Sequence, residues 1–447
     1  MAVSSAEKPS GPTRMLPVLF ASTVGTSIEW YDFFLFNLLS ASVFGKLFFP
    51  NFSPLAGTIL AFTTNFVGFA ARPIGGAFFG WFGDRVGRKS TLVVTLLLMG
   101  IATFLIGCLP VYTQIGVASP ILVSVLRFLQ GAGVGGEWGG SVLLSMEYGD
   151  SRRRGFWSSW PQTGVPVGLA LAAIAIIICQ AIFPGTAFLS IGWRIPFFFS
   201  AILIFIGLYI RLRILETPSF ARIKAENRLS RSPLTEVFKH HWREIVLAAL
   251  LRSGEQAPFY IFSAYILTYG KGLKIDTSTL YTGIIIGAII AFIAIPTFSG
   301  LSDRVGRKRL FLFGVIVMAI FAFPYFLLLN TKNPFLVVLS IAISIGICHA
   351  WLYGIEASLI SEHFGTKLRY TGASLGYQFA SITAGGPAPI IAVALFAAYK
   401  SFVPIAIYII VMCIISVLAL TGLREYSNKE AAADIEPETA TALEAGV

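Results

Sequence analysis

Apolar stretches bounded by charged or turn-forming residues divide this chain into candidate membrane spans. A spanning helix takes about 20 apolar residues, so a chain of 447 residues has room for twelve. Only 12% of the residues are charged and the mean hydropathy is +0.78, whereas a soluble domain carries about 25% charged residues. We therefore expect an all-α membrane protein. The predicted spans are 16–41, 55–82, 90–110, 118–147, 155–183, 194–212, 244–270, 279–301, 310–329, 334–361, 371–399 and 402–423.

The basic residues predict how these spans are oriented. With both termini in the cytoplasm, 24 of the 33 Lys and Arg residues lie on the inner side, as cytoplasmic loops prefer. The net charge of +11 is then explained without nucleic acid. We expect a cytoplasmic N-tail (1–15), two six-helix halves (16–212 and 244–423), a cytoplasmic linker between them (213–243), and a disordered cytoplasmic C-tail (424–447).

A repeated loop relates the two halves. The six residues from Asp84 to Lys89 recur unchanged from Asp303 to Lys308, 219 positions later, each time after the second span of a half. The same offset takes Glu137 to Glu356. Halves related in this way are typical of transporters. The repeat predicts two pseudo-symmetric halves around a central cavity.

The composition of this loop predicts a conformational gate. Its glycines favour a tight turn at the membrane surface, and its Asp and Arg charges can form pairs that hold in one conformation and break in another. Alternatively the basic residues serve topology alone, although topology requires no aspartate. The predicted gating residues are Gly83, Asp84, Arg85, Gly87, Arg88, Lys89, Asp303, Arg304, Gly306, Arg307 and Lys308.

Further motifs extend along the whole chain. They are EWYDF at 29–33, RPIGG at 72–76, RFLQG at 127–131, GGEWGG at 135–140, GWRIPF at 192–197, ETP at 216–218 and RYTG at 369–372. With the repeated loop, they resemble the metabolite:proton symporter family of the major facilitator superfamily, and within it the shikimate-type permeases. The resemblance implies the major facilitator fold, with spans one, four, seven and ten lining the cavity. It also implies proton symport of a metabolite such as shikimate, α-ketoglutarate, citrate or proline/betaine, with no cofactor because the proton gradient drives transport.

Charged residues inside the spans are expected to mark function, since each costs at least about 2.5 kcal/mol at the bilayer centre. Glu29 and Asp32 lie three residues apart and so on one face of span one. With Arg127 they are the predicted proton-coupling residues, and the resemblance to proton-coupled sugar porters favours Asp32 as the partner of Arg127. Alternatively Arg127 is only a structural counter-ion for Asp32 or Glu29.

The predicted substrate-binding residues follow helical stripes on spans four, seven and ten. They are Arg127, Gln130, Glu137, Trp138, Arg252, Glu255, Gln256, Tyr260, His349, Tyr353 and Glu356. Several have simpler alternatives: Glu137 and Glu356 bond hydroxyl or backbone groups, and His349 is a hydrogen-bonded core residue. Arg72 is expected near the inner end of span two, where it snorkels or braces the repeated loop.

The two cavity arginines favour an anionic substrate, because a guanidinium binds a carboxylate through two parallel hydrogen bonds. Glu255 is expected to hold Arg252 until the substrate competes. A betaine is the alternative, since the acids and aromatic residues could form a cation cage. A channel or a non-transporting sensor also stays open, whereas no nucleophile–base pair or metal cluster suggests an enzyme. We expect a monomeric protein of the bacterial inner membrane whose partners are substrate, protons and lipid, without nucleic acid.

Overall fold

The computed structural model describes residues 12–212, 233–364 and 369–425. In its first half, span one is α1 (Pro12–Leu39), continued by the π-helical η1 (Ser40–Phe44) and by α2 (Gly45–Phe48). The next five spans are α3 (Pro54–Val86), α4 (Arg88–Cys108), α6 (Ala118–Tyr148), α8 (Trp160–Ile182) and α10 (Ile195–Leu212). Short helices join them: α5 (Tyr112–Ile115), η2 (Ser151–Arg153), α7 (Arg154–Ser158), α9 (Thr186–Ser190) and η3 (Gly192–Arg194).

The second half repeats this order with more interrupted spans. After α12 (Pro233–His240), span seven consists of α13 (Trp242–Leu251), α14 (Ser253–Tyr260), η4 (Ile261–Tyr265) and α15 (Ile266–Gly272). Continuous helices follow in α16 (Thr277–Val305) and α17 (Arg307–Asn330). The last three spans are α18 (Pro334–Ile343) with η5 (Ser344–His349) and α19 (Ala350–Ser361), α20 (Arg369–Ala380) with η6 (Ser381–Gly385) and α21 (Pro387–Tyr399), and α22 (Val403–Gly422).

This architecture confirms the predicted all-α fold of twelve membrane helices. Within the described residues, ten helices are long and apolar enough by themselves to cross a membrane. The other two spans are the most polar ones. Span one carries Glu29 and Asp32, and span seven carries Arg252 and Glu255 and is broken into short helices. Each of these two spans therefore carries two charged residues within a few positions of each other.

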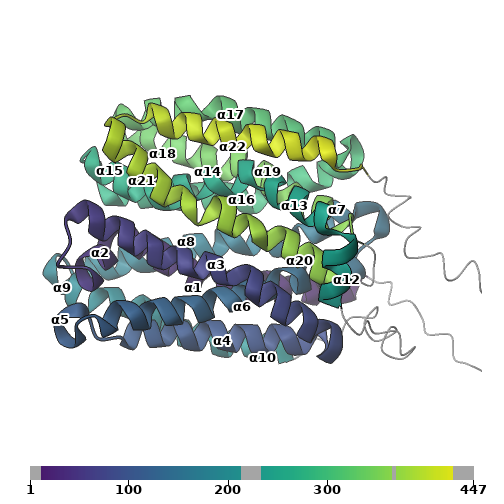
Figure 1. Ribbon diagram of the computed structural model, residues 1–447, viewed down its shortest axis with the longest axis horizontal. Helices are drawn as coiled ribbons and strands as arrows, with labels where there is room; N and C mark the ends of the chain where they lie inside the picture. The colour runs from purple at the N-terminus through teal and green to yellow at the C-terminus, as the bar shows by residue number, and fades with distance from the viewer. Residues whose placement is uncertain (1–11, 213–232, 365–368, 426–447) are drawn as a thin grey trace, which may run out of the picture.

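Figure 1 shows the two halves as two adjoining bundles, the first in purple to blue-teal and the second in teal to yellow. They meet where α8 packs along α16 and where α3 packs along α20. One end of the molecule carries α7 and α12, and the opposite end carries α2, α5, α9 and α15 (Figure 1). We name these the inner and outer ends, after the predicted orientation.

Glycines allow α3 and α6 to cross at very short distance. A Cβ atom at Gly131 would lie 1.9 Å from the Gly68 carbonyl oxygen, and one at Gly135 would lie 2.0 Å from the Arg72 carbonyl oxygen. Only a residue without a side chain fits such a backbone contact, as at other close membrane-helix crossings. The crossing fixes the two arginines of these helices, Arg72 and Arg127, at the centre of the first half.

The repeated loops are tight turns, as their glycines predict. One residue separates α3 from α4 and one separates α16 from α17, namely Gly87 and Gly306. Their φ angles are +125° and +101°, a region that favours glycine because it has no Cβ atom. The same sequence therefore makes the same turn in both halves.

Some predicted boundaries need correction. The first helix starts at Pro12, inside the expected N-tail of 1–15, because nothing in 12–15 stops the helix from extending beyond the apolar run. The expected linker 213–243 contains α12 and the start of α13, while its residues 213–232 lie outside the described part of the chain. Residues 426–447 of the expected disordered C-tail also lie outside it.

Candidate functional site

Two arginines lie at the centre of the first half, both next to the ring of Phe33. Arg72 is fully buried in the middle of α3, with its guanidinium carbon 4.1 Å from the Phe33 ring centroid and 4.7 Å from that of Phe69. Arg127 of α6 is equally buried and also lies 4.1 Å from the Phe33 centroid. The two guanidinium groups therefore share one aromatic neighbour, which attracts cations through its ring face.

The placement of Arg72 overturns our expectation for it. The side chain neither snorkels to the inner surface nor contacts the repeated loop, since α3 runs for 33 residues and Arg72 lies near its midpoint. Its Nη1 donates to the Ser381 hydroxyl at 3.5 Å, and the guanidinium also interacts with the Tyr260 hydroxyl. Its Nε and Nη2 atoms have no hydrogen-bond partner there.

Arg127 does not pair with an acid in this conformation. Nη1 donates to Gln130 Oε1 at 2.6 Å and Nη2 donates to Asn65 Oδ1, while Asn65 Nδ2 donates to Asn37 Oδ1 at 2.7 Å. Within the described part of the chain, neither Arg127 nor Arg72 forms an ion pair. In this conformation neutral amides bind both terminal nitrogens of Arg127, and the alternative that Arg127 is a counter-ion for Asp32 or Glu29 stays a prediction.

Asp32 is nevertheless connected to Arg127 through two intermediate side chains. Its carboxyl group lies beside the Thr103 hydroxyl, and Gln130 Nε2 donates to that hydroxyl at 2.6 Å. The same Gln130 accepts from Arg127. Glu29 and Asp32 are both buried, each with 1% exposure. Their proton-coupling role stays a prediction.

Glu137 and Trp138 of α6 contact other helices of the centre. Glu137 accepts hydrogen bonds from Thr26, at 2.9 Å, and from Ser141, as the hydroxyl-bonding alternative describes. Trp138 donates from Nε1 to Gln162 Oε1 at 2.8 Å, and its ring stacks on that of Tyr377 with centroids 3.8 Å apart. Since Tyr377 belongs to α20, this stack joins the two halves.

The second half contains a closed cluster of ionisable groups around Arg252. Arg252 Nε donates to Glu356 at 2.9 Å, Nη2 donates to Glu255 at 3.1 Å, and Nη1 donates to the Tyr377 carbonyl at 2.7 Å. Glu255 also contacts His349 Nε2 at 2.8 Å. The structure thus shows the expected contact between Glu255 and Arg252, and it brings Glu356 and His349 to the same place.

Aromatic rings enclose His349 from both faces. The ring stacks on Phe259 at 4.0 Å and on Tyr353 at 5.0 Å between centroids. The Tyr353 hydroxyl accepts from the Tyr377 hydroxyl at 3.0 Å. Four predicted residues, Arg252, Glu255, His349 and Glu356, therefore form one cluster, with Tyr353 packed against it.

Ser381 connects the two halves at the centre. Its hydroxyl accepts hydrogen bonds from Arg72 Nη1 of the first half and, at 3.3 Å, from Gln256 Nε2 of the second. Tyr260 packs beside them, with its ring 4.7 Å from that of Phe69. Sequence reasoning missed Ser381, Tyr377 and the central place of Arg72. The sequence did contain a signal, since all three are polar residues inside predicted spans.

The repeated loop of the second half makes charged contacts at the inner end. The Asp303 carboxylate accepts from the backbone amides of Gly155 and Phe156 at 2.9 and 3.0 Å, and Arg307 lies 3.2 Å from it. Arg307 also lies 2.7 Å from Glu362. Because Gly155 and Phe156 belong to the first half, Asp303 joins the halves at this end.

The other predicted gating residues contribute less to these contacts. Lys89 and Lys308 each donate to a backbone carbonyl, at Leu212 and Leu423, over 2.8 and 2.5 Å. Arg304 is exposed, and Gly83 packs against Thr91 and Tyr370. The side chains of Asp84, Arg85 and Arg88 lie outside the described part of the structure, so their predicted pairs stay predictions.

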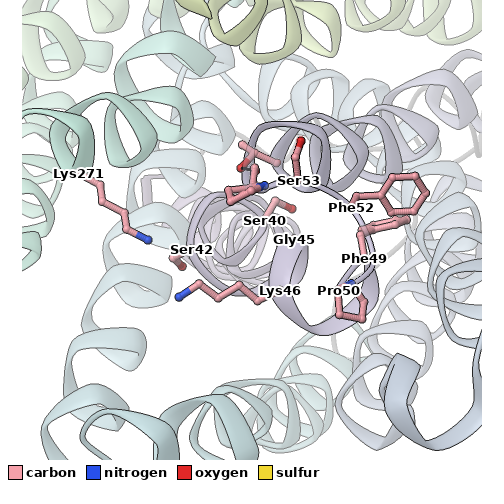
Figure 2. A pocket seen from close by; sticks show the side chains of 11 residues that line it. Ser40, Ser42, Gly45, Lys46, Phe49, Pro50, Phe52, Ser53 and Lys271 are labelled. Atoms are coloured by element: carbon pink, nitrogen blue, oxygen red, sulfur yellow. Dashed lines mark hydrogen bonds between the residues drawn. The ribbon is translucent and has the colours of Figure 1, made fainter.

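A pocket of about 310 Å³ opens at the outer end. It is lined by η1, α2 and the following turn, and by Lys271 from the second half. Figure 2 shows Lys46 and Lys271 on opposite sides, with both ammonium groups turned toward the same gap near Ser42. Asp303 joins the two halves at the inner end, whereas the outer end presents a hollow with two positive charges from different halves.

Comparison with known proteins gives three findings. The family model of the Major Facilitator Superfamily matches residues 25–389. The shikimate transporter of Escherichia coli (strain K12) is 38% identical over 92% of this chain and 94% of its own length. The glycine betaine/proline/ectoine/pipecolic acid transporter OusA of Dickeya dadantii (strain 3937) is 32% identical over 93% of this chain and 84% of its own length.

A solved structure supports the fold independently. The crystal structure of a D-xylose-proton symporter aligns with a TM-score of 0.69 over 91% of this chain and 96% of that chain, at 20% identity. At this identity the likeness concerns the fold and not the substrate. The sequence relatives are membrane transporters, so the expectation that the chain is not an enzyme is confirmed.

Proposed function

Since this chain belongs to the major facilitator superfamily and is a transporter, we propose that it carries a small organic acid into the cell together with protons, by alternating access. The substrate class is a hydroxylated or keto carboxylate of about the size of shikimate. In this proposal the protein resides in the bacterial inner membrane with both termini in the cytoplasm, as the basic loops predict.

The observation that carries the anionic substrate is the pair of arginines around Phe33. Arg72 and Arg127 are both fully buried, and neither has an ion-pair partner among the described residues. Two buried cations without a counter-ion are unfavourable in a low-dielectric interior, so a negatively charged ligand gains free energy there. Lys46 and Lys271 at the outer pocket would attract the same kind of ligand from solution.

Proton coupling is supported by the acids that accompany these arginines. Asp32 is buried beside Thr103 and forms no ion pair with the residues that the structure describes, so it can bind and release a proton as the helices around it move. The Arg252 cluster offers a second place, because one arginine faces two carboxylates and His349 contacts one of them. A proton bound in either place offsets the negative charge that arrives with the substrate.

A betaine is the second candidate, favoured by the relative OusA and by the central aromatic residues. The aromatic rings that could surround a quaternary ammonium already pack against other side chains, however. Arg72 occupies the space over Phe33 and Phe69, Trp138 stacks on Tyr377, and Tyr353 stacks on His349. These contacts favour the acid over the betaine.

Uptake competition tests the substrate class. Cells expressing the protein take up labelled shikimate while an excess of shikimate, its methyl ester or glycine betaine is present. We expect inhibition by the acid and little by the ester or betaine. Inhibition by betaine as strong as that by the acid would contradict an anion-selective site. Saturable uptake that an uncoupler abolishes would separate a carrier from a channel, and no uptake at all would favour a sensor.

A further inference from the structure

We propose that Arg72, rather than Arg127 or Arg252, binds the substrate carboxylate, in a polar site that the two halves share. The site consists of Arg72 from α3, Gln256 and Tyr260 from α14, and Ser381 from η6. This inference rests on the proposed function, because it assigns the group that recognises the organic acid.

Arg72 has the free hydrogen-bonding capacity that a carboxylate requires. Its guanidinium carbon lies 5.0, 4.1 and 4.7 Å from the ring centroids of Trp30, Phe33 and Phe69. Among the described residues its polar contacts are the long hydrogen bond to Ser381 and an interaction with the Tyr260 hydroxyl. Nε and Nη2 are both without a partner in the described structure. These are the two adjacent donors that bind both oxygens of a carboxylate in a bidentate pair.

The other two arginines lack this capacity. Arg252 uses Nε, Nη1 and Nη2 on Glu356, Tyr377 and Glu255. Arg127 uses both terminal nitrogens on Gln130 and Asn65. Its Nε lies only 3.0 Å from the position of a Cβ atom at Gly68, so the backbone of α3 covers that side. A ligand could reach neither group without breaking contacts that the protein already makes.

The neighbours of Arg72 suit a hydroxyl or keto oxygen next to the carboxylate. Gln256 has an unpartnered Oε1 that can accept from a hydroxyl group, and its Nε2 donates to Ser381 at 3.3 Å. Ser381 begins a π-helical turn, a distortion found often at functional sites. The side chain of Tyr260 lies beside the same guanidinium. The expected ligand is therefore a carboxylate bearing further polar oxygens.

This location also explains how binding would be linked to movement. Arg72 belongs to the first half, while Gln256, Tyr260 and Ser381 belong to the second. A ligand that contacts all of them is bound by both halves only when the halves are close. It therefore favours that arrangement by its differential affinity, as any ligand-driven conformational change requires.

Titration calorimetry on the purified full-length protein tests this assignment. The ligands are shikimate, 2-oxoglutarate and citrate, each compared with its methyl ester, and the variants are Arg72→Gln, Arg72→Lys and Ser381→Ala. Arg243→Gln is the matched control, since it makes the same substitution at an exposed position of α13. The unliganded melting temperature of each variant reports whether it is folded.

We expect the wild type and Arg243→Gln to bind at least one acid more than tenfold more tightly than its ester. Arg72→Gln should bind that acid roughly 10- to 100-fold more weakly and lose the preference over the ester, because a charged hydrogen-bonded pair is removed. Arg72→Lys should fall between, and Ser381→Ala should weaken binding several-fold. If Arg72→Gln does not fold, the affinities of Arg72→Lys and Ser381→Ala test the assignment of the carboxylate ligand.

Two results overturn the inference in distinguishable ways. If the wild type prefers an acid and the folded Arg72 variants keep that preference and affinity, the proposed function stands but Arg72 is not the carboxylate ligand. If the wild type binds none of the acids more tightly than their esters, the proposal of an anionic substrate is wrong. The assignment of Arg72 as its ligand is then wrong as well.

Discussion

Removing the Asp303 carboxylate should open the inner end of the protein. In the structure this group accepts from the amides of Gly155 and Phe156 at 2.9 and 3.0 Å and contacts Arg307 at 3.2 Å, with a side chain only 5% exposed. Since the amides belong to the first half and Asp303 to the second, the contact exists only while the inner end is closed. Asp303→Ala removes it without changing the central site.

The size of the free-energy change follows from the two charged hydrogen bonds that Asp303 accepts from the backbone amides. Each contributes about 1.5–3 kcal/mol, so their loss destabilises the closed inner end by about 3 kcal/mol or more. That corresponds to a roughly 100-fold shift of the equilibrium toward the open inner end. Turnover should fall because return to the closed state becomes slow, while ligand affinity should change much less, since Asp303 is remote from Arg72 and Asp32.

Hydrogen exchange followed by mass spectrometry measures this opening directly. Peptides covering Gly155 and Phe156 should exchange much faster in Asp303→Ala than in the wild type. Asp276→Ala, at the outer end of the same helix α16, is the matched control and should leave these peptides unchanged. Unchanged exchange in Asp303→Ala, or a loss of ligand affinity as large as the loss of transport, would refute the reasoning.

Three further predictions concern other parts of the molecule. Asp32→Asn should abolish proton-driven accumulation of substrate while leaving exchange across the membrane partly intact, because exchange needs no net proton movement; pH-dependent accumulation by the variant would remove Asp32 from coupling. Gly131→Ala should lower the melting temperature, since its Cβ would lie 1.9 Å from the Gly68 oxygen and such overpacking costs about 1–3 kcal/mol, whereas Gly272→Ala, with open space around it, should not. Reporter fusions at Glu226 and Lys332 should give opposite signals, and the same signal at both would contradict the predicted orientation.

The fold could be predicted because it depends on patterns that act locally. Apolar runs of sufficient length must be helical in a bilayer, and the repeated sequence around Gly87 and Gly306 allowed one kind of turn in both halves. The interruptions of span seven were not predictable in the same way. They place Arg252 between two short helices, and this depends on packing against helices distant in sequence.

The candidate site was predictable in its residue types but not in its pairs. Arg252 contacts Glu255 as expected, because side chains three positions apart on a helix lie on the same face. Arg127 forms hydrogen bonds with Asn65 and Gln130 instead of an ion pair with Asp32. Several polar groups lie within reach of its guanidinium, and the three-dimensional packing determines which of them it binds. Arg72 was misplaced because its distance from the repeated loop was underestimated: it lies near the middle of the predicted span 55–82 and of α3, which runs from Pro54 to Val86.

The central claim is that an organic acid and a proton cross the membrane together, and proton movement in proteoliposomes tests it most directly. Vesicles with a trapped pH-sensitive dye receive shikimate on the outside without any imposed gradient, and protein-free vesicles correct for passive entry of the acid. We expect acidification of the lumen with the wild type, little with Asp32→Asn, and none when glycine betaine replaces the acid. Uptake of shikimate without acidification, or acidification driven by betaine, would contradict it.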